Sequence, residues 1–186
     1  QIPNFPGLDR FQGKVFHSSQ WDHDYDLAGK KVVSVGTGAS AIQYVPQIAP
    51  EVARLTVVQR TPGWIIPRDE RTYSKLTKTL FRRFPLLRKL HRVRLYWSNE
   101  SRVVPIFHPR LAGLLEKVVK QFIRFQVKDK ETARKLTPSY TLGCKRIMIS
   151  NRYYPTFNRD NVSLVTEGVK EIREHSIVFS DGTEQQ

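Results

Sequence analysis

The chain has 186 residues, of which 39% are hydrophobic, and it carries 31 Lys or Arg against 17 Asp or Glu. That length suits one domain with a core that buries about 70% of the unfolded chain's surface, and two full domains would be crowded. The single cysteine, Cys144, excludes an internal disulfide framework and favours a reducing, cytoplasmic compartment. The sequence offers no signal peptide and no apolar run of membrane-spanning length.

Two segments open the chain. Residues 1–29 are predicted to form an irregular linker, because proline and glycine interrupt them. Residues 30–67 are predicted to form the first half of a Rossmann-type unit. Its predicted elements are a strand at 31–35, a helix from about 39 that Pro46 shortens, and a strand at 55–59.

The turn after the first strand carries the pattern GxGxxA, formed by Gly36, Gly38 and Ala41. In a Rossmann unit such glycines permit a tight turn and let the backbone approach a pyrophosphate, which the free amides at the helix start then face. The sequence therefore predicts a dinucleotide site, and a tight turn without a ligand is the alternative. Its predicted cofactor-binding residues are Gly36, Thr37, Gly38, Ala39 and Ser40.

The second strand is followed by Arg60 and Thr61, where an NAD site would carry an acidic residue for the ribose hydroxyl. A guanidinium donates paired, charge-assisted hydrogen bonds to a phosphate, whereas a carboxylate would repel it. The sequence therefore predicts NADP(H), with Arg60 and Thr61 at its 2′-phosphate. The alternative is that Arg60 is an ordinary solvated residue at the end of a strand.

Residues 68–135 are predicted to form a basic helical insert. The insert holds 19 Lys or Arg against 6 Asp or Glu, and so supplies almost all of the net charge of +14. Two helices broken near Phe84-Pro85 are predicted, followed by an amphipathic helix whose apolar stripe runs from Leu111 to Phe122. We expect a solvated basic face on helices that cover a neighbouring domain. Contact with an anionic membrane surface is the alternative, and no specific nucleic-acid partner is expected, because the charge is confined to this one insert.

Residues 136–186 are predicted to return to the Rossmann-type sheet. The predicted strands are 162–165, 169–173 and 177–179, of which the last two form a hairpin. The predicted fold class is therefore α/β: a Rossmann-like NADP-binding domain with a mostly parallel sheet, a basic helical insert and a small β-hairpin. No metal site is predicted.

A second motif precedes the glycine turn and reads FxGxxxHxxxW, formed by Phe11, Gly13, His17 and Trp21. Together with GxGxxA, the run Gln59-Arg60-Thr61 and the run Gly143-Cys-Lys-Arg146, this motif resembles the NADPH-binding middle part of flavin-dependent Baeyer-Villiger monooxygenases. N-oxygenating and S-oxygenating flavin monooxygenases share much of the pattern but usually carry another residue where Trp21 stands. They are the alternative family.

The resemblance implies an enzyme in which NADPH reduces FAD and O2 then serves to convert a ketone into an ester or lactone. A small ketone or another lipophilic molecule is the expected substrate partner. It implies that Lys145 adds a second cation at the 2′-phosphate. It also implies that Arg146 lies near the flavin and that His17 couples NADPH position to domain closure, which makes these two residues the catalytic candidates. For the adjacent Lys145 and Arg146, a plain solvated surface is the competing interpretation. For His17 and Trp21, the alternative is a hydrogen-bonded histidine and an aromatic side chain that packs under a linker.

The resemblance further implies that the FAD domain of a parent chain is the partner, because this sequence lacks the N-terminal GxGxxG of an FAD site. We expect a fragment that binds NADP and is inactive alone. A non-catalytic basic binding module is one further alternative. An NADPH domain of a disulfide reductase is another, and it predicts a CxxC motif that the sequence does not contain.

Overall fold

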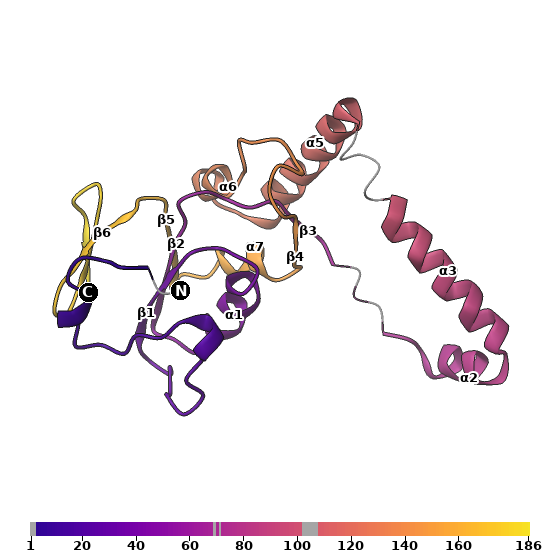
Figure 1. Cartoon of the computed structure of the whole chain (residues 1–186), viewed down its shortest axis with the longest axis horizontal. Coiled ribbons are helices and arrows are strands. Elements are labelled where there is room, and N and C mark those ends of the chain that lie inside the picture. Colours follow the sequence, from indigo (N-terminus) through magenta and orange to yellow (C-terminus); the bar gives the residue numbers. More distant parts are fainter. Residues whose placement is uncertain (1–2, 69, 71, 102–107) are drawn as a thin grey trace.

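The computed structural model describes residues 3–68, 70, 72–101 and 108–186. Figure 1 shows a three-stranded parallel sheet between the C-terminal strands (yellow) and the helices. Its strands are β1 (Lys31–Val35), β2 (Arg54–Val58) and β5 (Val162–Val165), in the order β1-β2-β5. The central strand β2 is buried from its second residue onward, which is typical of a parallel strand covered on both faces.

Helix α1 (Ala41–Ile48) connects β1 to β2. Its apolar face is buried through Ala41, Ile42, Val45 and Ile48. Pro46 lies inside the helix, which ends two residues later, so the predicted shortening by proline agrees with the observed eight-residue helix. The β1-α1-β2 order with parallel strands is the crossover unit that the sequence predicts.

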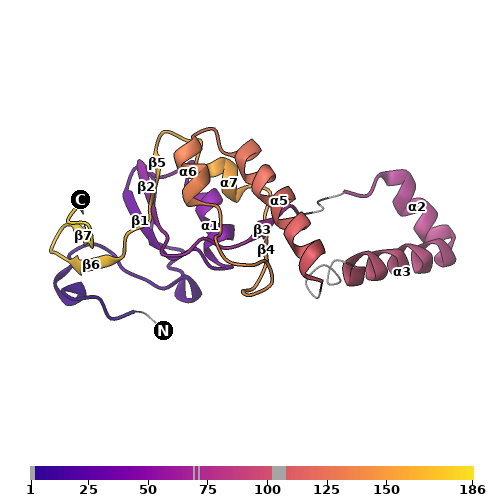
Figure 2. The same cartoon turned by 90° about the horizontal axis from the view of Figure 1, so that it is seen from above.

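Three more helices complete the main core: α5 (Pro109–Gln126), α6 (Lys130–Lys135) and α7 (Tyr153–Thr156). Helix α7 packs on α1 and α5, and Figures 1 and 2 both place α6 and α7 beside α5. Buried side chains from these helices join those of α1 and β2 in one cluster. The contributions of α5, α6 and α7 include Val119, Ile123, Ala133, Tyr153 and Tyr154.

Two short strands, β3 (Ile65–Ile66) and β4 (Met148–Ile149), form a separate parallel pair. The backbone amide of Met148 donates to the carbonyl of Trp64 (2.8 Å), and that of Ser150 donates to the carbonyl of Ile66 (3.0 Å). This pair joins the segment that leaves β2 to the segment that precedes α7.

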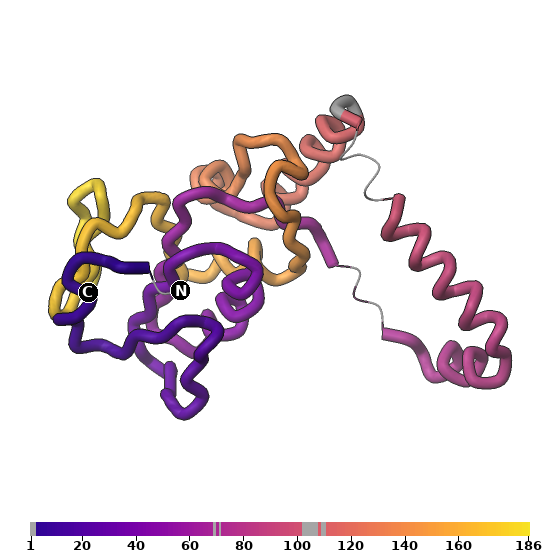
Figure 3. The backbone as a smooth tube through the Cα atoms, viewed as in Figure 1, coloured from indigo at the N-terminus to yellow at the C-terminus, as the bar shows by residue number. Residues whose placement is uncertain are grey.

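The C-terminal strands β6 (Val169–Ile172), β7 (Ile177–Phe179) and β8 (Glu184–Gln185) form a small antiparallel sheet. The hairpin of β6 and β7 is predicted by the sequence, whereas β8 is not. The first part of the N-terminal segment, with the 3-10 turn η1 (Leu8–Arg10), lies beside this sheet (Figure 3), and the segment then continues to a second 3-10 turn, η2 (Ser18–Gln20). The amide of Ile172 donates to the carbonyl of Pro6 (2.8 Å), which fastens the two ends of the chain together.

Helices α2 (Lys75–Arg83) and α3 (Pro85–Ser101) form a hairpin, and Figures 1 and 2 show it apart from the sheet. Neither helix has a buried residue. The break between them falls between Arg83 and Pro85, as the Phe84-Pro85 pair predicts.

The predicted α/β fold, with a parallel sheet and a small antiparallel sheet, is confirmed. The predicted insert at 68–135 divides into two parts in the structure, because α2 and α3 stand apart while α5 and α6 contribute to the core. Within the part of the chain that the structure describes, no helix has the length and apolarity needed to cross a membrane.

Candidate functional site

The glycine turn lies between the end of β1 and the start of α1. Gly36 has φ = 96°, a backbone conformation that side chains other than glycine rarely adopt, and a Cβ on Gly36 or Gly38 would meet no atom within 4 Å. Among the described residues, the backbone amides of Gly38, Ala39 and Ser40 donate no hydrogen bond. Open space and unpaired amides at a helix start are what an anionic group needs.

The end of the neighbouring strand β2 leads into Gln59, Arg60 and Thr61. Arg60 and Thr61 are exposed, and Arg60 forms no ion pair with any carboxylate of the described residues. Because β1 and β2 are parallel neighbours, with Val35 opposite Val58, their carboxyl ends meet at one edge of the sheet. The glycine turn and Arg60 therefore follow adjacent strand ends.

Buried Gln59 fixes the strand end that carries Arg60. Its backbone amide donates to the carbonyl of Val165 on β5 (2.7 Å), and its side-chain amide donates to the carbonyl of Lys135 at the end of α6 (2.9 Å). Only 2% of Gln59 is exposed, and a buried amide group without partners would be costly. Gln59 thus holds β2, β5 and α6 together beside Arg60.

Trp64 connects the segment after Arg60 to the segment before Lys145. Its indole Nε1 donates to the carbonyl of Tyr140 (3.0 Å), its ring meets the Tyr140 ring edge-on at 6.4 Å, and its side chain is fully buried. Its own carbonyl accepts from the amide of Met148 (2.8 Å). These bonds tie residues 60–64 to residues 140–148, which are far apart in sequence.

Lys145 and Arg146 are both exposed on the segment that Trp64 fastens. The Nζ of Lys145 lies 4.7 Å from the centre of the Tyr140 ring, within the range of a cation–π interaction. Arg146 forms no ion pair with a carboxylate in the described parts of the chain. Their roles at the 2′-phosphate and near a flavin stay predictions.

The FxGxxxHxxxW motif is fastened to the glycine-turn unit by Trp21. The Trp21 ring packs on Tyr44 of α1 with centroids 5.1 Å apart, and the Tyr44 hydroxyl lies 2.7 Å from the Ser34 hydroxyl of β1. The Phe11 ring occupies the space where a Cβ on Gly13 would lie, so a larger residue at this position would displace the ring. The motif therefore lies against β1 and α1.

His17 caps the 3-10 turn η2 in the structure. Its Nδ1 accepts a hydrogen bond from the backbone amide of Ser19 (3.2 Å) and lies 2.7 Å from the Ser19 hydroxyl. These contacts orient the imidazole ring within its own segment. The predicted part of His17 in domain closure stays a prediction.

An ion pair joins the middle of this motif to its end. The ammonium of Lys14 lies 2.7 Å from a carboxylate oxygen of Asp22. The hydrogen bond from Lys14 is the main cause that lowers the pKa of Asp22, and the same contact raises the pKa of Lys14. Both groups therefore stay charged at neutral pH.

A groove of about 370 Å³ runs along β1 between the motif and the small antiparallel sheet. Its lining includes Phe11, His17, Trp21, Ser34 and Tyr44. The glycine turn, Arg60 and Lys145 lie outside it. The groove and the candidate dinucleotide site are thus separate features of the surface.

Two residues of the site, Trp64 and Tyr140, were not identified from the sequence, and Gln59 was named only as part of the Gln59-Arg60-Thr61 run, without a role. All three make contacts with residues far away in sequence: Gln59 bonds to Lys135, and Trp64 bonds to and packs against Tyr140. A large aromatic residue four positions after Arg60 was the available signal for Trp64, and the sequence alone gives it no partner.

The whole chain, residues 1–186, matches the family model described as flavin-binding monooxygenase-like. It is 49% identical over 185 residues to a Baeyer-Villiger monooxygenase of Pseudomonas aeruginosa and 48% identical to one of Streptomyces coelicolor. The match covers 99% of this chain in both cases, but only 35% and 36% of those relatives. The chain thus spans about a third of their length.

Solved structures agree with these matches. A steroid monooxygenase bound to NADP aligns with a TM-score of 0.83 at 28% identity, covering 100% of this chain and 43% of the other. A cyclohexanone monooxygenase of Rhodococcus sp. Phi1 bound to NADP+ aligns with a TM-score of 0.80 at 26% identity, covering 100% and 42%. The family predicted from FxGxxxHxxxW and GxGxxA is confirmed: the chain belongs to the flavin-binding monooxygenase-like family and corresponds to part of the Baeyer-Villiger monooxygenases that it resembles.

Proposed function

We propose that this chain is the NADPH-binding part of an FAD-dependent monooxygenase that oxidises ketones to esters or lactones. In the overall reaction, NADPH supplies two electrons, one oxygen atom of O2 enters the ketone, and the other leaves as water. FAD, bound by the rest of the parent protein, supplies the redox and oxygen chemistry. The contribution of this chain is to bind and orient NADPH.

One observation carries the proposal: an open glycine turn and an exposed arginine, which pairs with no carboxylate among the residues that the structure describes, follow two adjacent parallel strands. The amides of Gly38, Ala39 and Ser40 would hold the pyrophosphate at the start of α1, together with Gly36 and Thr37. Arg60 and Thr61, at the end of β2, would bind the 2′-phosphate that distinguishes NADP from NAD.

Lys145 would add a second positive charge at the 2′-phosphate, since the Trp64 bonds bring its segment beside the one that begins at Arg60. Arg146 would face the flavin, where a permanent cation stabilises negative charge that develops on oxygen. His17, on the motif packed against β1 and α1, would couple NADPH position to domain closure.

The comparisons support this proposal by what the related structures contain. The steroid monooxygenase and the Rhodococcus cyclohexanone monooxygenase are bound to NADP, and another cyclohexanone monooxygenase is bound to ε-caprolactone, a lactone. We propose the same cofactor and the same class of product here. The cytoplasm is the proposed compartment, in keeping with the single, unpaired Cys144.

Calorimetric titration of the chain with NADP and with NAD tests the proposal. We expect NADP to bind more tightly, and Arg60→Ala to lower NADP affinity roughly tenfold to hundredfold while NAD affinity is unchanged. Arg54→Ala is the matched control, because Arg54 is an exposed arginine at the opposite end of the same strand. Equal affinity for the two dinucleotides, or the same loss in both variants, would contradict the proposal.

A further inference from the structure

Lys145 does not extend freely from its segment, although it is exposed. Its ammonium lies 4.7 Å from the centre of the Tyr140 ring, and cation–π attraction acts within about 6 Å of a ring centre. A turn between the two residues permits this contact. The amide of Cys144 donates to the carbonyl of Thr141 (3.1 Å), and Gly143 has φ = 96°, which favours glycine.

The Tyr140 ring is itself held from the core. The Trp64 indole donates to the Tyr140 carbonyl (3.0 Å) and packs edge-on against the Tyr140 ring with an interplanar angle of 77°. Trp64 is fully buried, so the Tyr140 ring rests on a rigid support. The support of Lys145 therefore runs from the core through Trp64 to Tyr140.

The phenol of Tyr140 is neutral, which favours the cation–π contact with Lys145. Burial is the main cause that raises the pKa of Tyr140, so the phenol stays neutral at physiological pH. The face of a neutral aromatic ring carries partial negative charge and attracts a cation. A lysine held in this way loses less side-chain entropy when it binds a phosphate than a lysine that is free to rotate.

We propose that Tyr140 is a positioning residue that pre-orients Lys145 for the 2′-phosphate and so contributes to the preference for NADP over NAD. The proposal rests on the proposed function of this site. Tyr140 does not contact the cofactor in this account and acts only through Lys145. Trp64 connects the two cationic segments, because it lies four residues after Arg60 and its side chain supports Tyr140.

A double-mutant cycle on the full chain separates this role from a general structural one. Tyr140→Leu removes the ring face, and we expect NADP affinity to fall roughly two- to fivefold with NAD affinity unchanged. Tyr140→Phe keeps an aromatic face and is expected to retain most of the affinity. In a Lys145→Ala background, Tyr140→Leu is expected to cause no further loss, because the group that it positions is gone.

The outcomes distinguish this proposal from the proposed function. If Arg60→Ala and Lys145→Ala leave the ratio of NADP to NAD affinity unchanged, the proposed function fails. Two results would overturn only the positioning role. In the first, Arg60→Ala and Lys145→Ala change that ratio but Tyr140→Leu does not. In the second, Tyr140→Leu lowers NADP affinity as much in the Lys145→Ala background as it does in the unsubstituted chain.

A second measurement needs no substitution that could impair folding. In the NMR spectrum of the unliganded chain, a ring held over the ammonium shifts the ε-methylene protons of Lys145 upfield. Lys78 on α2 is the reference, because no aromatic ring lies over its ammonium within the described part of the chain. Equal shifts for the two lysines would overturn the proposal.

Discussion

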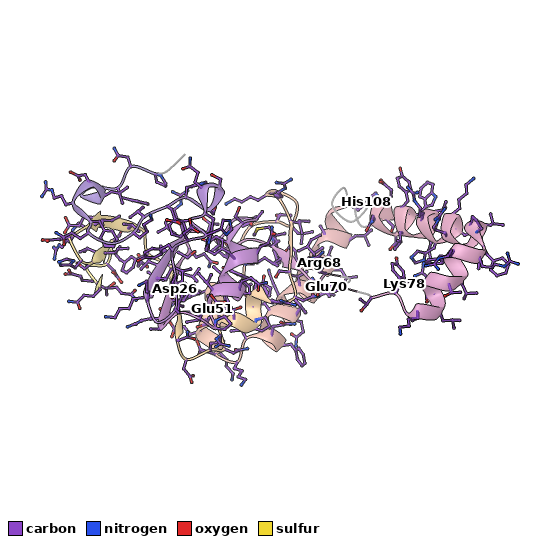
Figure 4. All side chains as sticks on the ribbon, turned by 90° about the horizontal axis from the view of Figure 1, so that it is seen from below. Asp26, Glu51, Arg68, Glu70, Lys78 and His108 are labelled. Atoms are coloured by element: carbon purple, nitrogen blue, oxygen red, sulfur yellow. The ribbon has the colours of Figure 1, made fainter. Side chains whose placement is uncertain are left out.

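The α/β body and the α2-α3 hairpin differ in what stabilises them. The body comprises the β1-β2-β5 sheet, the β3-β4 pair and the β6-β7-β8 sheet with α1, α5, α6 and α7. In the body, helices and central strands place side chains in buried clusters. The hairpin has no buried residue, and its large apolar side chains are exposed: Leu86 by 67%, Leu90 by 56% and Trp97 by 65%. Figure 4 shows the hairpin, with Lys78 labelled on it, apart from the body.

Local signals account for the hairpin. The Ser74 hydroxyl accepts from the backbone amide of Thr77 (3.1 Å) and caps α2, while Pro85 occupies the first turn of α3, where proline is tolerated. A small cluster of Tyr73, Phe81 and His91 joins the helices, with a hydrogen bond of 2.8 Å between Tyr73 and His91. Helix formation therefore needs no core here, whereas the candidate site depends on long-range bonds such as that of Trp64.

The sharpest test of this difference is the same substitution in both regions. Trp64→Ala removes a fully buried ring and its hydrogen bond, and we expect it to lower the free energy of unfolding by about 3–5 kcal/mol. Trp97→Ala on α3 is expected to change it by less than about 0.5 kcal/mol. Urea unfolding followed by circular dichroism measures both, and similar losses would mean that the hairpin is part of the cooperative core.

Asparagine offers a second matched pair with a smaller expected effect. The Asn161 side chain donates to the carbonyls of Ala49 (2.8 Å) and Val52 (2.9 Å), where α1 ends and β2 approaches. Asn161→Ala leaves both carbonyls without this donor, and we expect a loss of about 1–3 kcal/mol in urea unfolding. Asn99→Ala on α3 removes an exposed side chain and is the control. If Asn161→Ala leaves the free energy of unfolding unchanged, the importance assigned to these bonds is contradicted.

Substitutions of helix-cap residues are expected to change stability least, and for Asp129 the change depends on pH. The Asp129 carboxylate accepts from the amide of Thr132 (2.7 Å) at the start of α6, and this backbone hydrogen bond is the main cause that lowers the pKa of Asp129. Because the pKa is lowered in the folded chain, the contribution is present at neutral pH. It is lost as the pH falls from the ordinary aspartate value through the lowered one.

We therefore expect Asp129→Ala to reduce stability slightly at pH 7, and the difference from the unsubstituted chain to vanish in acid. Ser74→Ala removes an uncharged cap of α2 and is expected to reduce helix content to the same extent at both pH values. Thermal unfolding at a series of pH values measures the first effect, and circular dichroism measures the second. A constant difference for Asp129→Ala from pH 7 to pH 2 would refute the assigned cause.

Sequence patterns predicted the elements whose signals are local. The apolar runs of β1, β2 and β5, the glycine turn and the Phe84-Pro85 break are all readable over a few residues, and the structure places elements there within one or two residues. Helix α6 was not predicted, although Asp129 before it is a recognisable cap. The two-residue strands β3 and β4 have no local pattern, because each depends on a partner far along the chain.

The residues of the candidate site also divide into those that a local sequence pattern identifies and those that depend on contacts made only in the folded chain. Gly36, Gly38 and Arg60 were identified because a short sequence pattern directly after a strand indicates phosphate binding. Trp64 and Tyr140 were missed, and no role was predicted for Gln59, because their roles depend on which backbone carbonyl or ammonium each side chain contacts after folding. Tyr153 and Tyr154, which follow Arg146 in the sequence, lie in the core, where burial raises the pKa of each hydroxyl.

The most direct test of the central claim is a crystal structure of the chain with NADP. We expect the pyrophosphate at the amides of Gly38, Ala39 and Ser40, and the 2′-phosphate within hydrogen-bonding distance of Arg60 and Lys145. An empty turn with both cations directed into solvent, in crystals grown with saturating NADP, would contradict the account.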